Sequence, residues 1–146
     1  SAVEFVGAHA AVPAPGVLES LAGAEVVVIA PSNPLVSIGP IRALAGVDLA
    51  LSARRDTVVA ISPIVAGSAL KGPADRMLTE LGHEASVVGV ARLYAPVCGT
   101  LVIDDADAHL AADVERTGMR CVVTPTIMKD LELSARLART TLEVVR

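Results

Sequence analysis

The polar loop at residues 30–40, APSNPLVSIGP, carries the first group of residues that could bind an anion. It follows the apolar run EVVVI and precedes a stretch with helical spacing. We expect Ser37 to cap that helix, which would leave the backbone N–H groups of Ile38 and Gly39 free at the positive end of the helix dipole. Gly39 would also let an anion approach the backbone closely. The loop has the features of a phosphate site, although an ordinary capped turn explains them as well.

A second polar loop at residues 61–73, ISPIVAGSALKGP, repeats this pattern. Ser62 and Pro63 end an apolar run, and Lys71 and Gly72 lie just before another helical stretch. Lys71 is one of only two lysines in the chain, so a mobile cation and a helix dipole could act on the same anion. The spacing is not that of a Walker loop. A solvated surface loop is the alternative interpretation.

Three carboxylates, Asp104, Asp105 and Asp107, follow a third apolar run. Oxygen ligands of this kind suit a hard cation. A simpler interpretation is a solvated turn in which Asp107 caps the next helix, and we favour it because one short turn supplies few converging ligands. The three histidines are isolated and have no nucleophile pattern nearby. We therefore assign no metal ligand and no catalytic residue within this chain.

The composition indicates one compact domain over residues 1–146. Hydrophobic residues make up 53% of the chain, with one Phe, one Tyr and no Trp, so the core is expected to consist of Ala, Val, Leu and Ile. A net charge of −4 without a basic cluster argues against nucleic acid as a partner. Cys98 and Cys121 are far apart and match no zinc or disulfide pattern. No apolar run approaches the roughly 18 residues of a membrane span, so we expect a cytoplasmic protein that does not bind membranes.

Short β-branched runs alternate with helical segments along the chain. Strands are predicted at 25–30, 57–62, 100–104 and 120–124, with a further strand at VEFV, 3–6. Helices are predicted at 15–22, 40–51, 73–81, 85–94, 108–116 and 129–145. This alternation predicts an α/β fold with a mainly parallel sheet and helices on both faces. Ligands of such sheets bind beyond the carboxyl ends of the strands, where Thr124, Thr126 and Met128 should join the two polar loops.

Four stretches of the chain, taken in order, resemble the C-terminal half of the 2-phospho-L-lactate transferase family (CofD and FbiA). They are APSNPLVSIGPI, ISPIVAGSALKGPADRML, LVIDDADA and TPTIMKDLELSARLA. The resemblance extends from about Glu25 to Leu142, and its first two motifs are highly specific. It implies a Rossmann-like fold and indicates that the chain is the C-terminal portion of a larger transferase, or an incomplete sequence of one.

The resemblance implies a group transfer in the biosynthesis of a deazaflavin coenzyme. A phospholactyl or phosphoenolpyruvyl group would pass from a GDP-linked donor to the 5-deazaflavin precursor Fo, with release of GMP. The alternative is a non-enzymatic, nucleotide-sugar-binding regulator that is similar to the gluconeogenesis-factor family. The SNPLVSIGPI motif favours the transferase, because the regulator is expected to carry GSLYTSI in that loop. An α/β nucleotide-binding module of neither kind is a third alternative.

The family's functional residues carry over to two sets of positions in this sequence. Those of the nucleotide-facing loop are Ser32, Asn33, Pro34, Ser37 and Ile38; those of the second loop are Ser62, Pro63, Ile64, Lys71 and Gly72. Two positions depart from the family pattern: Ala66 replaces an expected glycine, and Arg42 replaces an expected aliphatic residue. If the backbone at Ala66 needs a positive φ, alanine would cost on the order of 1 kcal/mol there.

The resemblance also implies parts that this sequence does not match. The family's N-terminal half has a Gly-rich turn and acidic residues that hold a divalent metal. We therefore expect Mg²⁺ as the cofactor, with its ligands in the missing half, and no activity from this chain alone. Stacking on guanine or deazaflavin would come from Tyr94, from aliphatic side chains or from that half. A homodimer is compatible with the sequence, which does not decide the oligomeric state.

Overall fold

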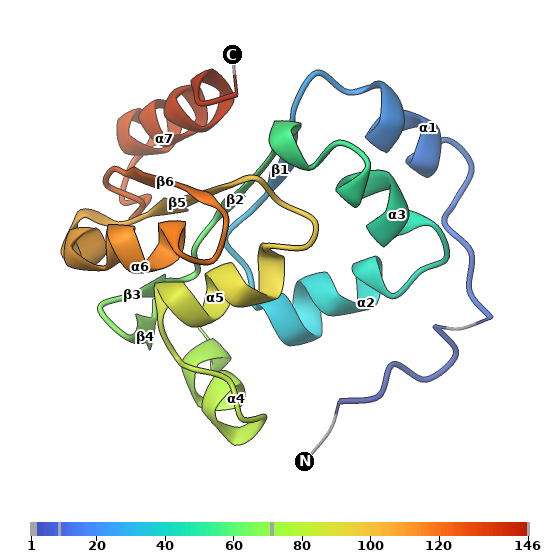
Figure 1. The fold of residues 1–146 in the computed structure, drawn as a ribbon, viewed down its shortest axis with the longest axis horizontal. Helices are drawn as coiled ribbons and strands as arrows, with labels where there is room; N and C mark the ends of the chain where they lie inside the picture. Colours follow the sequence, from blue (N-terminus) through green and yellow to red (C-terminus); the bar gives the residue numbers. More distant parts are fainter. Residues whose placement is uncertain (1–2, 9, 71, 146) are drawn as a thin grey trace.

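A four-stranded parallel sheet forms the centre of the computed structural model, which describes residues 3–8, 10–70 and 72–145. Its strands, in spatial order, are β1 (Val27–Ile29), β2 (Val58–Ile61), β5 (Thr100–Ile103) and β6 (Arg120–Val123). Val59 of β2 lies opposite Val28 on one side and opposite Thr100 on the other. All four strands were predicted, and the α/β fold class is confirmed (Figure 1).

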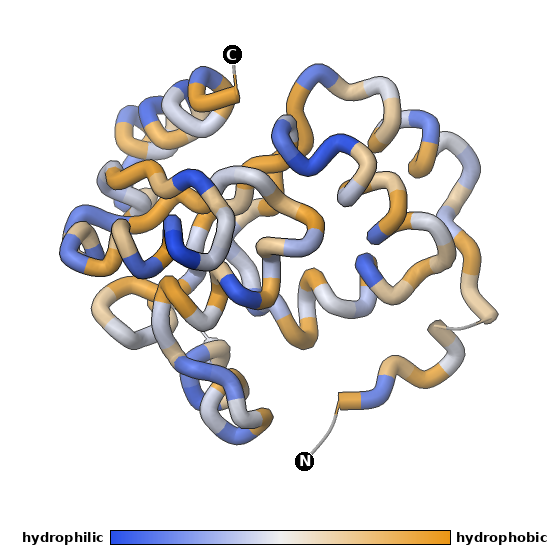
Figure 2. The backbone as a smooth tube through the Cα atoms, in the orientation of Figure 1, coloured by the Kyte–Doolittle hydropathy of each residue, from blue (hydrophilic) through white to orange (hydrophobic). Residues whose placement is uncertain are grey.

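Helices cover both faces of the sheet, whose central strands β2 and β5 are buried along their whole length. Figure 2 gives the hydropathy of the chain in the same view. The larger core lies under α1 (Val17–Gly23), α3 (Val47–Ser52), α4 (Ala74–Glu80), α5 (Val87–Tyr94) and α6 (Ala111–Glu115). The smaller core lies on the other face, where Leu137 of α7 (Leu131–Glu143) packs against Val59, Ile61 and Val102. This arrangement agrees with the predicted Rossmann-like architecture.

The remaining elements are short and lie mostly in the connections. They are the π-helix η1 (Pro34–Ile38), the helix α2 (Gly39–Arg42), the 3₁₀-helices η2 (Arg55–Thr57) and η3 (Asp105–Leu110), and the antiparallel hairpin of β3 (Ile64–Val65) and β4 (Ser68–Ala69). No helix in the described ranges is long and apolar enough to cross a bilayer.

Three predictions about the elements were wrong. Residues 3–6 form no strand, and the ring of Phe5 lies against Gly39 instead. The helix predicted over 40–51 is interrupted between α2 and α3, where Gly46 adopts a left-handed φ of 85°. The helix predicted from residue 108 begins earlier, as the 3₁₀-helix η3. The β3–β4 hairpin was not predicted.

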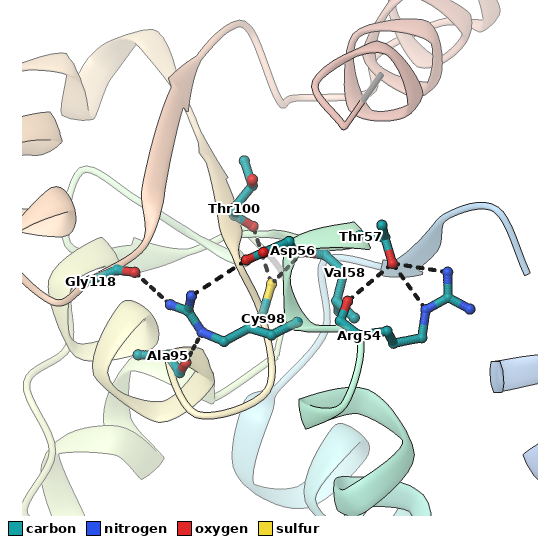
Figure 3. Close-up of polar contacts among 9 residues, drawn as sticks. Arg54, Asp56, Thr57, Val58, Ala95, Cys98, Thr100 and Gly118 are labelled. Carbon is teal, nitrogen blue, oxygen red and sulfur yellow. Dashed lines mark hydrogen bonds and ion pairs between the residues drawn. The ribbon is translucent and has the colours of Figure 1, made fainter.

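At the amino-terminal edge of the sheet, arginine side chains bind backbone carbonyls. Figure 3 shows the contacts made with Thr57, Ala95 and Gly118. Arg54 donates hydrogen bonds to Thr57 and to the carbonyl groups of Leu21, Ala22, Ala24 and Glu25. Arg55 donates to the carbonyl groups of Ala95, at the end of α5, and Gly118, before β6. These arginines serve the fold, since several of their partners are carbonyls at the ends of α1 and α5, which lack intrahelical partners.

Candidate functional site

A pocket of about 610 Å³ lies at the carboxyl-terminal edge of the sheet. Three loops line it, which follow β1, β2 and β6. The lining residues are Pro31, Ser32, Asn33, Val36, Ser37, Ser62, Pro63, Leu70, Gly72, Pro73, Ala74, Thr126, Ile127 and Met128. We call this cavity the carboxyl-edge pocket. It brings together the two polar loops that the sequence placed at one edge, together with the predicted Thr126 and Met128; Thr124 is not part of its lining.

The first loop begins its helical turn at Asn33 and not at Ser37. The Asn33 side-chain oxygen accepts hydrogen bonds from the backbone N–H groups of Leu35, at 2.9 Å, and Val36, at 3.2 Å. The Asn33 carbonyl accepts from the N–H groups of Ser37 and Ile38, both at 3.1 Å. The predictions of a Ser37 cap and of a free Ile38 N–H were therefore wrong. An Asn cap followed by Pro34 at the first helical position starts the π-helix four residues earlier.

The residues of this loop divide between the pocket and the protein interior. Ser32, Asn33 and Ser37 line the pocket. Ile38 packs against the larger core. A Cβ atom at Gly39 would lie 2.8 Å from Cζ of Phe5, so the nearest neighbour of Gly39 here is an aromatic ring. Gly39 and the buried Pro34 line a different cavity, beside Phe5. Gly39 is therefore not part of the lining of the carboxyl-edge pocket.

The second loop begins with a serine that turns the chain after β2. Ser62 is buried, and its hydroxyl donates to the Ile64 carbonyl at 3.0 Å and accepts from the Ile64 N–H at 3.1 Å. Ile64 is fully buried in the core, so of this pair only Ser62 reaches the pocket lining. Lys71 lies outside the described residues. Its chain neighbours Leu70 and Gly72 both line the pocket.

Residue 66, where the family pattern has a glycine, lies in the turn at the tip of the β3–β4 hairpin. Ala66 has a φ of 50° and Gly67 a φ of 76°, and two positive φ values in a two-residue loop are typical of a type I′ turn. Ala66 is the single non-glycine residue with a positive φ in the described part of the chain. Its N–H donates to Oδ2 of Asp107 at 2.9 Å. The turn therefore keeps the left-handed conformation although alanine disfavours it.

The aspartate cluster has a different role from the predicted helix cap. Asp104, not Asp107, caps η3 by accepting from the Ala106 N–H at 3.1 Å. Its other oxygen accepts from the N–H and hydroxyl of Thr126, at 2.8 and 3.1 Å. Desolvation is the largest influence on the pKa of Asp104 and acts to raise it. These hydrogen bonds and the charge of Lys129 together outweigh it and lower the pKa.

Two further expectations concern Tyr94 and Arg42. Tyr94 is fully buried in the larger core, so it cannot stack on a ligand, and burial raises the pKa of its hydroxyl. Arg42 forms a bidentate pair with Asp48, at 2.8 and 2.9 Å, and donates to the Leu93 carbonyl at 3.0 Å. This departure from the family pattern therefore connects α2 to α3 and α5.

Comparison with known proteins identifies the family. The family model described as 2-phospho-L-lactate transferase CofD matches residues 2–141. The chain belongs to the CofD family. It is 47% identical over 139 residues to a phosphoenolpyruvate transferase of Kitasatospora aureofaciens, a match that covers 94% of this chain and 43% of the relative. It is 39% identical over 127 residues to a 2-phospho-L-lactate transferase of Methanothermobacter thermautotrophicus, covering 87% of this chain and 41% of the relative.

A third CofD relative, a phosphoenolpyruvate transferase of Streptomyces griseus, is 41% identical over 144 residues and is covered to 45% of its length. The chain thus spans less than half the length of these relatives. The carboxyl-edge pocket of this CofD chain also contains Val36, Leu70, Ala74 and Ile127, which lie within the matching stretches but were not predicted as site residues. The local sequence around these four apolar residues does not indicate that they line a pocket, because their place there depends on how the three loops meet.

Proposed function

We propose that the full-length protein is a transferase that moves a phospholactyl or phosphoenolpyruvyl group from a GDP-linked donor to Fo in deazaflavin coenzyme biosynthesis. Membership of the CofD family and the names of the relatives support this class of reaction. The observation that carries the proposal is the carboxyl-edge pocket, in which both CofD motif loops meet at the edge where nucleotides bind in parallel sheets.

In the proposed reaction the terminal hydroxyl oxygen of Fo bonds to the phosphorus atom that carries the three-carbon acid. The bond from that phosphorus to the bridging oxygen breaks, GMP leaves with the bridging oxygen, and the hydroxyl proton is released. Catalysis of this kind depends mainly on positioning and charge stabilisation. We propose that Ser32, Asn33 and Ser37 orient the nucleotide part of the donor, since they present hydroxyl and amide groups in the pocket lining.

Mg²⁺ would neutralise phosphate charge in such a reaction. The described residues contain no group of three or more His, Cys, Asp or Glu side chains that could hold a metal ion. This part of the chain therefore does not fit a resident magnesium site. We propose that the ligands lie in the rest of the full-length protein. The two described cysteines are unpaired, which is compatible with a cytoplasmic location.

Ser37→Asp tests the nucleotide assignment. Ser37 is exposed at the pocket lining, so a carboxylate there would repel the phosphates of GDP. We expect the affinity for GDP, measured by calorimetry on the full-length protein with Mg²⁺, to fall about tenfold or more. Ser20→Asp is the matched control, because Ser20 is an exposed serine on α1 and does not line this pocket. Equal affinity in wild type and Ser37→Asp would contradict the assignment.

Detection of reaction products distinguishes the transferase hypothesis from the regulator hypothesis. The full-length wild-type protein, given Fo, Mg²⁺ and a donor in which phosphoenolpyruvate or phospholactate is joined to GMP through a diphosphate bridge, should yield GMP and a phospho-acylated Fo, both measurable by mass spectrometry. GDP binding without either product would favour the nucleotide-binding regulator instead.

A further inference from the structure

Two buried aspartates, one at the N-cap of η3 and one within it, each bind a different loop of the carboxyl-edge pocket. Asp104 and Asp107 are 8% and 2% exposed. Asp104 accepts both polar hydrogens of Thr126, in the loop after β6. Asp107 accepts the N–H of Ala66, in the hairpin after β2. Neither aspartate lines the pocket itself.

These contacts are stronger than ordinary loop contacts. Burying a carboxylate is costly unless its oxygens accept hydrogen bonds, so each aspartate requires its partner loop to stay in place. Hydrogen bonds to a charged acceptor are about twice as strong as neutral ones. The lowered pKa of Asp104 agrees with this, because desolvation alone would raise it, and the hydrogen bonds from Thr126 and Ala106 together with the charge of Lys129 reverse the direction.

The Asp107 contact falls on the strained point of the hairpin. Ala66 is held at a φ of 50°, a conformation that L-residues other than Asn and Asp rarely adopt. A turn of this kind persists only where its surroundings hold it. The same hairpin leads directly into Leu70 and Gly72, which line the pocket. A change at Asp107 should therefore move the second loop relative to the first.

We propose that Asp104 and Asp107 are positioning residues, which hold the third and second loops of the carboxyl-edge pocket on η3 in the arrangement that binds the nucleotide. The inference rests on the proposed function, because it takes the pocket to be the nucleotide site. It assigns a role to LVIDDADA that is neither metal binding nor catalysis. Asp105, between the two, is exposed and makes no such contact in the described structure.

The test compares three aspartate variants of the full-length protein with GDP as the probe. Asp107→Ala should weaken GDP binding roughly tenfold, because the hairpin loses its charge-assisted hydrogen bond. Asp107→Asn should retain most of the affinity, since the amide oxygen still accepts from Ala66. Asp105→Ala is the matched control and should bind GDP as wild type does. If Asp107→Ala binds GDP as tightly as wild type does, the contact with Ala66 does not position the second loop, and the proposal is overturned.

A second substitution separates positioning from general stability. Glycine adopts a positive φ without strain, so Ala66→Gly should restore much of the GDP affinity lost in Asp107→Ala. Ala66→Gly alone should leave GDP affinity unchanged. A merely structural role of Asp107 predicts instead that the melting temperature falls while GDP affinity, measured well below that temperature, stays at the wild-type value. That result would overturn the proposal.

Amide hydrogen exchange measured without GDP tests this inference independently of the proposed function. In Asp107→Ala the amides of residues 64–69 should exchange faster, whereas those of β2 and β5 should keep wild-type protection. In Asp104→Ala the Thr126 amide should respond in the same way. If wild type binds no GDP, the proposed function fails while this measurement still decides whether η3 holds the loops. Unchanged exchange at Ala66 and Thr126 would overturn the proposal even where GDP binds.

Discussion

At the scale of single residues, Ala66 is the clearest case of a side chain that its backbone disfavours. Its φ of 50° costs an L-residue roughly 1 kcal/mol relative to glycine, so Ala66→Gly should raise the free energy of unfolding by up to about that amount. Glycine also gains entropy in the unfolded chain, which reduces the net effect. Chemical denaturation measures the change. Ala53→Gly, at an exposed residue in the αR region, is the control and should be neutral or destabilising.

Asp104 should make the stability of the protein depend on pH. Its folded-state pKa is lowered, so its contribution is fully present above the pKa of an unfolded aspartate, about 4, and is lost as the pH falls through the folded value. The difference in free energy of unfolding between wild type and Asp104→Asn should therefore be largest near pH 6 and shrink towards pH 3. Denaturation at several pH values measures it. Asp105→Asn is the surface control for this comparison, because Asp105 is exposed and makes no comparable contact in the described residues.

At the scale of elements, the predictions that succeeded were those for structure that depends on residues close together in the sequence. The strands were predictable because Val58 to Ile61 and Thr100 to Ile103 are apolar on both faces of one sheet. The start of η1 was missed because Asn33 and Pro34 are typical of both a loop and a helix start. The bonds of Asp104 to Thr126 and of Asp107 to Ala66 join residues 22 and 41 positions apart. No local pattern indicates such partners, so these contacts could not be predicted.

The connection of α2 to α3 and α5 through Arg42 should contribute to stability without affecting the site. Arg42→Leu removes the bidentate bond to Asp48 and the bond to the Leu93 carbonyl, so we expect about 1 kcal/mol of destabilisation. Arg42 does not line the carboxyl-edge pocket, so GDP affinity should not change. Thermal denaturation and calorimetry measure the two. Arg76→Leu is the control, since its pair with Glu80 is largely exposed and should contribute little. Loss of GDP affinity in Arg42→Leu would contradict this separation.

At the scale of the whole molecule, the two edges of the sheet differ in what their polar groups do. At the amino-terminal edge, Arg54 and Arg55 bind carbonyl groups from α1, the end of α5 and the residue before β6. At the carboxyl-terminal edge, three loops surround a cavity of about 610 Å³. This asymmetry is expected in a parallel sheet, because every strand ends on the same side and the loops that follow can converge there. Binding of a ligand in this cavity should therefore affect segments that lie far apart in the sequence.

Hydrogen exchange of the full-length protein with and without GDP tests this arrangement directly. Binding should slow amide exchange in residues 31–37, 62–70 and 124–128, because all three segments contribute to the carboxyl-edge pocket or continue into its lining. Residues 54–57, at the opposite edge, should exchange at the same rate in both states. The two edges belong to the same strands, so a general stabilisation of the sheet would slow exchange at both. Protection confined to the first loop would instead mean that the other two loops lie away from the nucleotide, and that the pocket serves the acceptor or another part of the donor.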